Sequence, residues 1–196
     1  MKYFYFMEDK LLLLRQHFEE IVSLTDDEWK FVKSHFEYRS LKKHQFLIQV
    51  GQPVDFEYWI IKGLVKAYSI DQKGKEHILQ FAMEDYWVSD HCAFQHQEPG
   101  TIFVDCLEDS EFFCLSLENR EKICFQVPAV ANFFRIKSNH GYINLQQRIL
   151  SLLTMTAESR YEYLLNKLPK LIQRVPKKLI ASYLGVSRET LSRFNS

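Results

Sequence analysis

The stretch KKLIASYLGVSRETLSRFNS, residues 177–196, predicts two short helices joined by a tight turn. Ala181 has a side chain small enough to let two helices cross closely, and Gly185 tolerates the positive φ of a turn. Ser187 is a typical N-cap, and Glu189 suits the positive end of the helix dipole. Apolar side chains recur at helical spacing, at Ile180, Leu184, Val186, Leu191 and Phe194. This combination is typical of a helix-turn-helix, a motif that reads duplex DNA.

The polar side chains of the second helix gather on one face. At about 100° per residue, four of them share an arc of roughly 140°, and Leu191 and Phe194 point the opposite way. Arg grips guanine through two hydrogen bonds, and Glu accepts from the cytosine amino group. The predicted base-contacting residues are Arg188, Glu189, Ser192 and Arg193. The predicted phosphate-contacting residues, near helix N-termini, are Lys177, Lys178 and Ser187. The alternative interpretation is an ordinary helical hairpin with a solvated charged face.

The charge distribution also favours double-stranded DNA as a partner. The whole chain is formally neutral, with 25 basic and 25 acidic residues. Residues 148–196 carry nine Lys or Arg and three Asp or Glu, a net charge of +6, which leaves −6 for residues 1–147. A cationic module beside an acidic one is expected where phosphate attraction must coexist with weak non-specific binding. Chance clustering of surface lysines is the alternative.

Composition and the longest apolar run predict a globular protein without a membrane-spanning segment. With 46% hydrophobic and 15% aromatic residues, a chain of 196 residues can bury a core in one large or two small domains. The longest apolar run, residues 11–14, is far below the roughly 20 residues that cross a bilayer, so no membrane partner is predicted. The opening MKYFYFMEDK is a poor secretory signal because aromatic and acidic residues follow its first Lys. We expect a cytoplasmic protein.

The four cysteines show no metal-binding or redox motif. Cys92, Cys106, Cys114 and Cys124 form no C-x-x-C pair and have no neighbouring His at metal-ligand spacing. We interpret all four as buried thiols, two of them in strand-like runs where Cys acts as a small apolar residue. A disulfide or a metal site is the alternative, and no cofactor is predicted.

The residues before Pro128 predict two helices and then several short strands. The helices are expected at residues 11–23 and 26–36, the second opened by a capping box of Thr25 and Glu28. Strands are expected at residues 58–62, 64–70, 77–82, 102–107 and 111–116. Gly63 separates the first two strands, and a Glu-Asp-Ser turn should make the last two a hairpin. Repeated short strands of this kind indicate a β-sandwich or barrel.

Pro128 fits the first turn of a long helix that we expect to pair with a second copy of the chain. Its predicted dimer seam alternates spacings of three and four, and consists of Phe133, Ile136, His140, Ile143, Gln147 and Leu150. The seam follows Ala129 at the same spacing, and its polar members are expected to fix register at some cost in stability. The alternative is a helix packed on its own β-domain. The predicted division is 1–127 for a sensor domain, 128–153 for the dimerisation helix and 154–196 for the DNA-binding domain.

In this order of elements, the chain resembles the Crp/Fnr family of bacterial transcription regulators. The most specific match is the run 187–193, SRETLSR, which is similar to the family's recognition helix. Further matches are GQ at 51–52, YWIIKGLV at 58–65 and LEDSE at 107–111, which resemble turns and hairpins of a cyclic-nucleotide-binding barrel. The resemblance implies an α+β fold: a double-stranded β-helix or jelly roll, a dimerisation helix and a helix-turn-helix. It assigns base contacts to Arg188, Glu189 and Arg193.

The resemblance also implies a homodimer on a near-palindromic operator, with RNA polymerase as a further partner if the chain activates transcription. No residue pattern marks a polymerase contact. The family's β-hairpin wing has no room, because only about ten residues separate Asn166 from Pro176.

The sensor pocket departs from the family pattern. Family members that bind cyclic nucleotides use Gly-Glu for the ribose and Arg followed by Ser or Thr for the phosphate. The matching stretches here are 87–90 and 98–101, which place the expected effector pocket at Ser89, Asp90, Gly100 and Thr101. Asp90 suits a sugar hydroxyl, but Gly100 stands where the phosphate-binding Arg would be, and the charge-matching fork is lost. The sequence therefore argues against cyclic AMP and leaves the effector, if one exists, unknown.

Other chemistries fit the sequence less well. An iron–sulfur switch needs clustered N-terminal cysteines, and haem sensing would depend on the lone His77. A metal-dependent barrel enzyme would use His77, His91, His96 and Glu98, but these lack the paired spacing of such sites. No nucleophile elbow, phosphate-binding loop or zincin motif is present, so no enzyme activity is expected. A small-ligand sensor that acts through protein partners without DNA is the remaining alternative.

Overall fold

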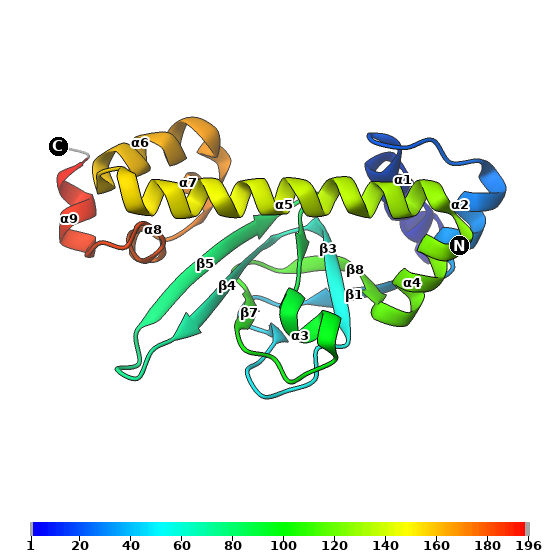
Figure 1. The fold of residues 1–196 in the computed structure, drawn as a ribbon, viewed down its shortest axis with the longest axis horizontal. Coiled ribbons are helices and arrows are strands. Elements are labelled where there is room, and N and C mark those ends of the chain that lie inside the picture. Colours follow the sequence, from blue (N-terminus) through cyan, green and yellow to red (C-terminus); the bar gives the residue numbers. More distant parts are fainter. Residues whose placement is uncertain (1, 195–196) are drawn as a thin grey trace.

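A β-barrel lies beneath one long helix that joins helical units at both of its ends (Figure 1). The computed structural model describes residues 2–194, with side chains from residue 7 onward. The strands are β1 (Glu37–Leu41), β2 (Phe46–Ile48), β3 (Phe56–Lys62), β4 (Leu64–Ile70), β5 (Glu76–Met83), β6 (Trp87–Val88), β7 (Phe103–Cys106) and β8 (Ser110–Ser116). The helices are α1 (Lys2–Glu19), α2 (Asp26–Lys33), α3 (His91–His96), α4 (Leu117–Gln126), α5 (Pro128–Thr154), α6 (Ala157–Lys167), α7 (Pro169–Arg174), α8 (Lys177–Leu184) and α9 (Arg188–Arg193).

The strands form two four-stranded antiparallel sheets, which confirms the predicted jelly roll. One sheet has the order β1-β8-β3-β6 and the other the order β2-β7-β4-β5. Their inward side chains interdigitate, with Ile60 and Phe112 from the first sheet against Val65 and Val104 from the second. The core of the barrel is therefore shared between strands that are far apart in the sequence.

The predicted hairpin between residues 102–107 and 111–116 is wrong. Strand β7 pairs with β2 and β4, whereas β8 pairs with β1 and β3, so the turn between β7 and β8 crosses from one sheet to the other. Strands β3 and β4 are likewise separated between the sheets at Gly63, which has a φ of +112°. A single residue is too short for a hairpin loop, and a positive φ at glycine lets the chain turn the corner instead.

The helices expected from the sequence are present, some with shifted ends, and the structure adds others, among them α3, α4 and α7. Helix α2 begins with the expected capping box, in which Thr25 and Glu28 each bond the other's backbone. Helix α1 ends at Glu19 rather than at residue 23. Helix α3 lies where a loop was expected, because Asp90 caps its N-terminus, and α4 begins at a second cap, Ser116.

Helix α5 has two different environments along its 27 residues. Near its start, Val130, Phe133 and Phe134 are buried among aromatic side chains of α1, α2 and β3, and the Phe133 and Phe18 ring centroids are 4.2 Å apart. From residue 138 to 154, every side chain except Arg148 and Ser151 is exposed. The first part of α5 thus packs with α1 and α2 against the barrel, and the second part has almost no contact with the rest of the chain.

The last four helices form a unit that docks on the outer face of the β4–β5 sheet. Barrel side chains, including Leu64, Ile78 and Phe81, share one buried cluster with Leu171 and Ile180 of this unit. Residues 155–194 of the described chain contain no strand, in agreement with the predicted lack of room for a β-wing. The domain boundaries stay predictions, and residues 1, 195 and 196 within them lie outside the described residues.

Two further expectations concern cysteines and membranes. Cys106 and Cys114 are fully buried, and burial raises the pKa of their thiols to about 11 and about 12. The same prediction is wrong for Cys92, which is exposed on α3, and for Cys124, which is partly exposed on α4. Across residues 2–194, no helix combines the length and apolar character that a bilayer crossing requires.

Candidate functional site

Helices α8 and α9 are joined by the turn that the sequence predicts. Gly185 ends α8 in the left-handed conformation, with a φ of +74°, and its N–H donates to the last turn of α8. The Val186 N–H donates to the Ala181 carbonyl at 3.0 Å, which closes the helix end. Ser187 then caps α9, since its hydroxyl oxygen accepts from the Thr190 N–H. Local sequence signals alone account for this geometry.

Helix α9 has one packed face and one exposed polar face. Leu191 is buried in the helical unit. The predicted base-contacting residues Arg188, Glu189, Ser192 and Arg193 are all exposed. The backbone N–H of Glu189 and the Ser187 hydroxyl lower the pKa of the Glu189 carboxyl, which therefore remains a charged acceptor. The Ser192 hydroxyl donates to the Arg188 carbonyl at 3.1 Å, so its oxygen is the part that remains to accept.

The predicted phosphate-contacting residues lie beside this face. Lys177 and Lys178 are exposed in the first turn of α8, and Ser187 is exposed at the start of α9. No side chain caps the N-terminus of α8, where Pro176 precedes the helix. Backbone N–H groups and two ammonium groups therefore face solvent together, an arrangement that suits a phosphate.

Three arginines of the cationic segment are held within the chain instead. Arg148 donates to the carbonyls of Ile78 and Tyr183, and Arg160 donates to those of Met155 and Leu184. Arg174 pairs with two barrel carboxylates. The net charge of +6 therefore overstates the positive charge that this segment presents to DNA. The sequence gives no local signal that distinguishes these arginines from the exposed ones.

The predicted effector residues come together, but their polar groups bond one another. Asp90 is 4% exposed and accepts from the Thr101 N–H and hydroxyl, both at 2.7 Å, and from the Ile102 and Ala93 N–H groups at 3.2 Å. Burial alone would raise the pKa of Asp90, but the hydrogen bonds from Thr101 outweigh it and lower the pKa. Ser89 donates to the Phe56 carbonyl. These groups anchor a loop and are not directed at a ligand.

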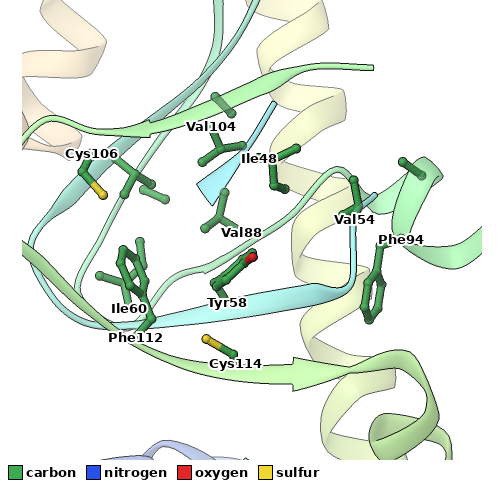
Figure 2. Close-up of a cluster of buried hydrophobic side chains, with 14 residues drawn as sticks. Ile48, Val54, Tyr58, Ile60, Val88, Phe94, Val104, Cys106, Phe112 and Cys114 are labelled. Carbon is green, nitrogen blue, oxygen red and sulfur yellow. The ribbon is translucent and has the colours of Figure 1, made fainter. Parts of the chain in front are cut away.

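Gly100 and the barrel interior leave little room for a ligand. A Cβ at Gly100 would lie 2.9 Å from the Gln49 carbonyl oxygen, so the backbone leaves no space for a side chain at this position. Figure 2 shows Tyr58, Phe94 and Phe112 among the side chains that fill the space between the sheets. A hollow of about 200 Å³ outside this core is lined by Gly51, Pro53, Val54, Asp55, Gln97, Glu98 and Pro99. Its two carboxylates are opposite in sign to what a phosphate needs.

Two of the four residues of the metal-enzyme alternative, His77 and His96, make separate contacts. His77 pairs with Asp71 at 2.8 Å, and His96 lies 3.6 Å from the Cys92 thiol. Within residues 2–194, no group of three or more His, Cys, Asp and Glu side chains is arranged to hold a metal ion.

The predicted dimer seam is only partly available to a second chain. Phe133 is completely buried in the core of its own chain, so its assignment to the seam is wrong in this conformation. Ile136 is half-buried, whereas His140, Ile143, Gln147 and Leu150 are exposed. The alternative of a helix packed on its own β-domain therefore describes the start of α5.

A second apolar row on α5 also follows spacings of three and four. Tyr142, Leu145, Ile149 and Leu152 have exposed fractions of 69%, 58%, 50% and 43%. At about 100° per residue, this row is centred nearly half a turn from the predicted seam. The heptad rule fits both rows, and only the exposure of the folded chain reveals this one.

Comparison with known proteins agrees with the architecture. Residues 38–126 match the family described as the cyclic nucleotide-binding domain. The chain is 26% identical to an anaerobic regulatory protein of Pasteurella multocida, over 79% of this chain and 60% of that protein. It is 25% identical to the transcriptional activator protein Anr of Pseudomonas protegens, over 79% of this chain and 67% of that protein.

Solved structures show the same fold. FixK2 of Bradyrhizobium japonicum superposes with a TM-score of 0.72 at 17% identity and covers 82% of both chains. The c-di-GMP-responsive global regulator CLP of Xanthomonas campestris gives 0.69 at 17% identity, over 87% of this chain and 89% of that one. The barrel, the long helix and the terminal helices thus occur together in other proteins.

Proposed function

Since the chain belongs to the Crp/Fnr family of regulators, we propose that it is a cytoplasmic homodimer that binds a near-palindromic DNA operator and regulates transcription. The relatives that carry the sequence similarity have names of regulatory proteins, and the chain spans 60% of the length of the Pasteurella protein. Each recognition helix α9 enters a major groove, where Arg188 and Arg193 read purine edges and Glu189 discriminates cytosine. The proposal thus assigns a base to each charged side chain of α9.

The exposed polar face of α9 is the observation that carries this proposal. Four polar side chains face solvent on a helix whose other face is packed, and the adjacent start of α8 presents two lysines. An ordinary surface helix would not account for the glycine turn before α9 or for the uncapped N-terminus of α8 beside it. Duplex DNA suits these features, because it offers base edges to the polar side chains and phosphates to the lysines.

The bare half of α5 supports the homodimer. Its row of Tyr142, Leu145, Ile149 and Leu152 is a contiguous apolar stripe, which monomeric proteins rarely expose. We assign the dimer seam to this row, which leaves Ile143 and Leu150 outside the seam. Two copies paired along α5 present two recognition helices, as an inverted repeat requires.

The barrel serves as a scaffold in this proposal, and cyclic AMP is not its ligand. The carboxylate of Asp90 is occupied by protein donors, and Gly100 supplies no cation for a phosphate. A ligand of this barrel would have to occupy the small acidic hollow or open the core. RNA polymerase is a partner if the protein activates transcription.

The decisive experiment is selection of bound sequences from a random duplex library by the purified protein at near-physiological salt. We expect enrichment of an inverted repeat whose half-sites are about one DNA turn apart. A protein that acts through protein partners would enrich no sequence and show no salt-dependent affinity for duplexes, and that result would refute the proposal.

A substitution in α9 tests the base-reading role on the enriched sequence. Arg188→Ala should cost about 1–3 kcal/mol of binding and relax the preference at one base position, because it removes a bidentate contact. Lys43→Ala, in the turn between β1 and β2, is the control and should leave the affinity unchanged. Equal weakening on the operator and on scrambled DNA would remove Arg188 from the base-reading set.

A further inference from the structure

Arg174, at the end of α7, links the helix-turn-helix unit to the barrel through two carboxylates. Its Nη1 donates to Glu84 at 2.7 Å, its Nε donates to Glu108 at 3.0 Å, and its Nη2 donates to both, at 3.0 and 2.7 Å. Glu84 follows β5, and Glu108 lies in the turn between β7 and β8. All three guanidinium nitrogens are therefore used in one planar, charge-assisted contact across the interface.

The two glutamates of this contact also make hydrogen bonds within the barrel. Glu84 also accepts from the Gly63 N–H at 2.8 Å, and the Ser110 hydroxyl donates to the Glu108 carbonyl at 2.8 Å. Burial alone would raise the pKa of Glu84, but Arg174 and the Gly63 N–H lower it, so the carboxylate stays charged. A preorganised pair of anions selects one orientation of the guanidinium plane.

A second anchor holds the same unit at the other end of β5. The Ser182 hydroxyl donates to the Glu76 carbonyl at 2.7 Å, and Arg148 joins the carbonyls of Ile78 and Tyr183. Ile78 and Glu84 are six residues apart along an extended strand, which is about 20 Å. An apolar interface tolerates rotation, but two polar anchors this far apart resist it.

The anchored helix leads directly into the recognition helix. Helix α8 lies against β5, and only three residues separate its end from the start of α9. Helix α5, which carries the bare row, is joined to both parts, because its Arg148 donates to the Ile78 carbonyl of β5 and the Tyr183 carbonyl of α8. In a dimer paired along α5, the separation of the two α9 helices depends on how rigidly each unit sits on its barrel.

We propose that Arg174 is a positioning residue that sets the spacing between DNA half-sites accepted by the dimer. This inference rests on the proposed function, because it requires a dimer that binds an inverted repeat. Arg174 touches no base in it. It restricts rotation of the helix-turn-helix unit relative to the barrel. Without that restriction, the unit can rotate to bind a half-site at a different spacing.

The test measures affinity for the enriched inverted repeat and for versions with one base pair added to or removed from its centre. One base pair turns a half-site by about 35° around the duplex. Wild type should bind the altered spacings about tenfold or more less tightly, and Arg174→Gln only about two- to threefold less, since the released unit reorients. At the best spacing, Arg174→Gln should bind about three- to tenfold more weakly, because ordering now occurs on binding.

Two further variants separate geometry from charge. Arg174→Lys keeps the positive charge but loses the planar fork, and it should lose spacing selectivity nearly as fully as Arg174→Gln. Lys170→Gln removes a charge from the exposed side of the same helix and should keep the wild-type spacing profile. A profile that follows charge and not the fork would overturn the assignment.

Hydrogen exchange without DNA supplies an independent measurement. Arg174→Gln should raise exchange of the amides at the α8–β5 contact and leave the barrel core unchanged. Wild-type binding with the same spacing profile in Arg174→Gln would refute the positioning role alone. No binding of wild type to any inverted repeat would refute the proposed function and, with it, the spacing role.

Discussion

The barrel and the helical end of the molecule differ in how much of their side-chain surface is buried. In the barrel, Asp90 is satisfied by four protein donors, and the aromatic cluster buries the start of α5. At the other end, the apolar row of α5 and the polar face of α9 are exposed. The apolar side chains that the barrel presents to α5 are buried within the chain, whereas the far end leaves an apolar row and a polar face exposed.

The largest expected effect tests the exposed apolar row. Ile149→Lys should shift the dimer to monomers, because burial of an Ile side chain is worth about 1.5–3 kcal/mol and is lost twice per dimer. Leu150→Lys is a matched control, since Leu150 is its neighbour and both are 50% exposed. Sedimentation at micromolar concentration should find monomers for the first and mostly dimers for the second. The reverse result would restore the seam that the sequence predicts.

The next effect tests whether the predicted effector residues are structural. Asp90→Ala should lower the free energy of unfolding by about 3 kcal/mol, because it leaves buried N–H groups without an acceptor. Asp55→Ala removes a carboxylate that is exposed at the nearby hollow and should change stability little. Urea unfolding measures both. A stable Asp90→Ala protein would mean that this carboxylate is held for a ligand after all.

A pH dependence tests the buried histidine of the barrel region, His17. Its Nε2 accepts from Trp87 at 3.0 Å, while Nδ1 lies 3.9 Å from the exposed Asp85. Burial, followed by the charge of Lys137, lowers the pKa of His17 to about 3. His17 is therefore protonated near pH 6.5 in the unfolded chain but stays neutral in the folded chain. The free energy of unfolding falls as the pH falls below 6.5.

Between pH 6.5 and 5, this histidine should cost about 2 kcal/mol of unfolding free energy. His17→Gln keeps an acceptor for Trp87 but has no such titration, and so removes this part of the slope. Urea unfolding of both proteins at several pH values gives the difference. Parallel curves would show that His17 is protonated in the folded chain.

The smallest effect compares two glycines. A Cβ at Gly185 or at Gly141 would meet no atom within 4 Å, but only Gly185 has a positive φ. Gly185→Ala should destabilise by about 1 kcal/mol through backbone strain, and Gly141→Ala should stabilise the exposed middle of α5 by up to about 1 kcal/mol. Thermal melts should shift in opposite directions. A shift in the same direction would indicate that the turn or the helix changes conformation.

Local patterns explain what the sequence predicts well. The capping box at Thr25, the glycine turn at Gly185 and the Ser187 cap depend on neighbours within four residues, and all three are present. Strand positions follow from short apolar runs. Which sheet a strand joins depends on contacts far along the chain, so the hairpin between β7 and β8 was mispredicted.

Non-local contacts also account for what the sequence analysis missed. Arg174 and Arg188 are the same residue type, but one meets two carboxylates of the barrel and the other faces solvent. Asp90 and Thr101 are predicted to line an effector pocket, and the folded chain brings them together, but as hydrogen-bond partners of each other. Spacing identifies residues that lie together, and packing decides whether their polar groups remain accessible.

The bare half of α5 has a consequence for dosage. A surface that only a second copy covers makes assembly depend on the amount of protein present. While monomers dominate, the proposed dimer, and with it operator occupancy, rises with the square of the protein concentration. The level at which the cell makes this chain would then act as a signal in its own right, with a sharper response than a monomer gives.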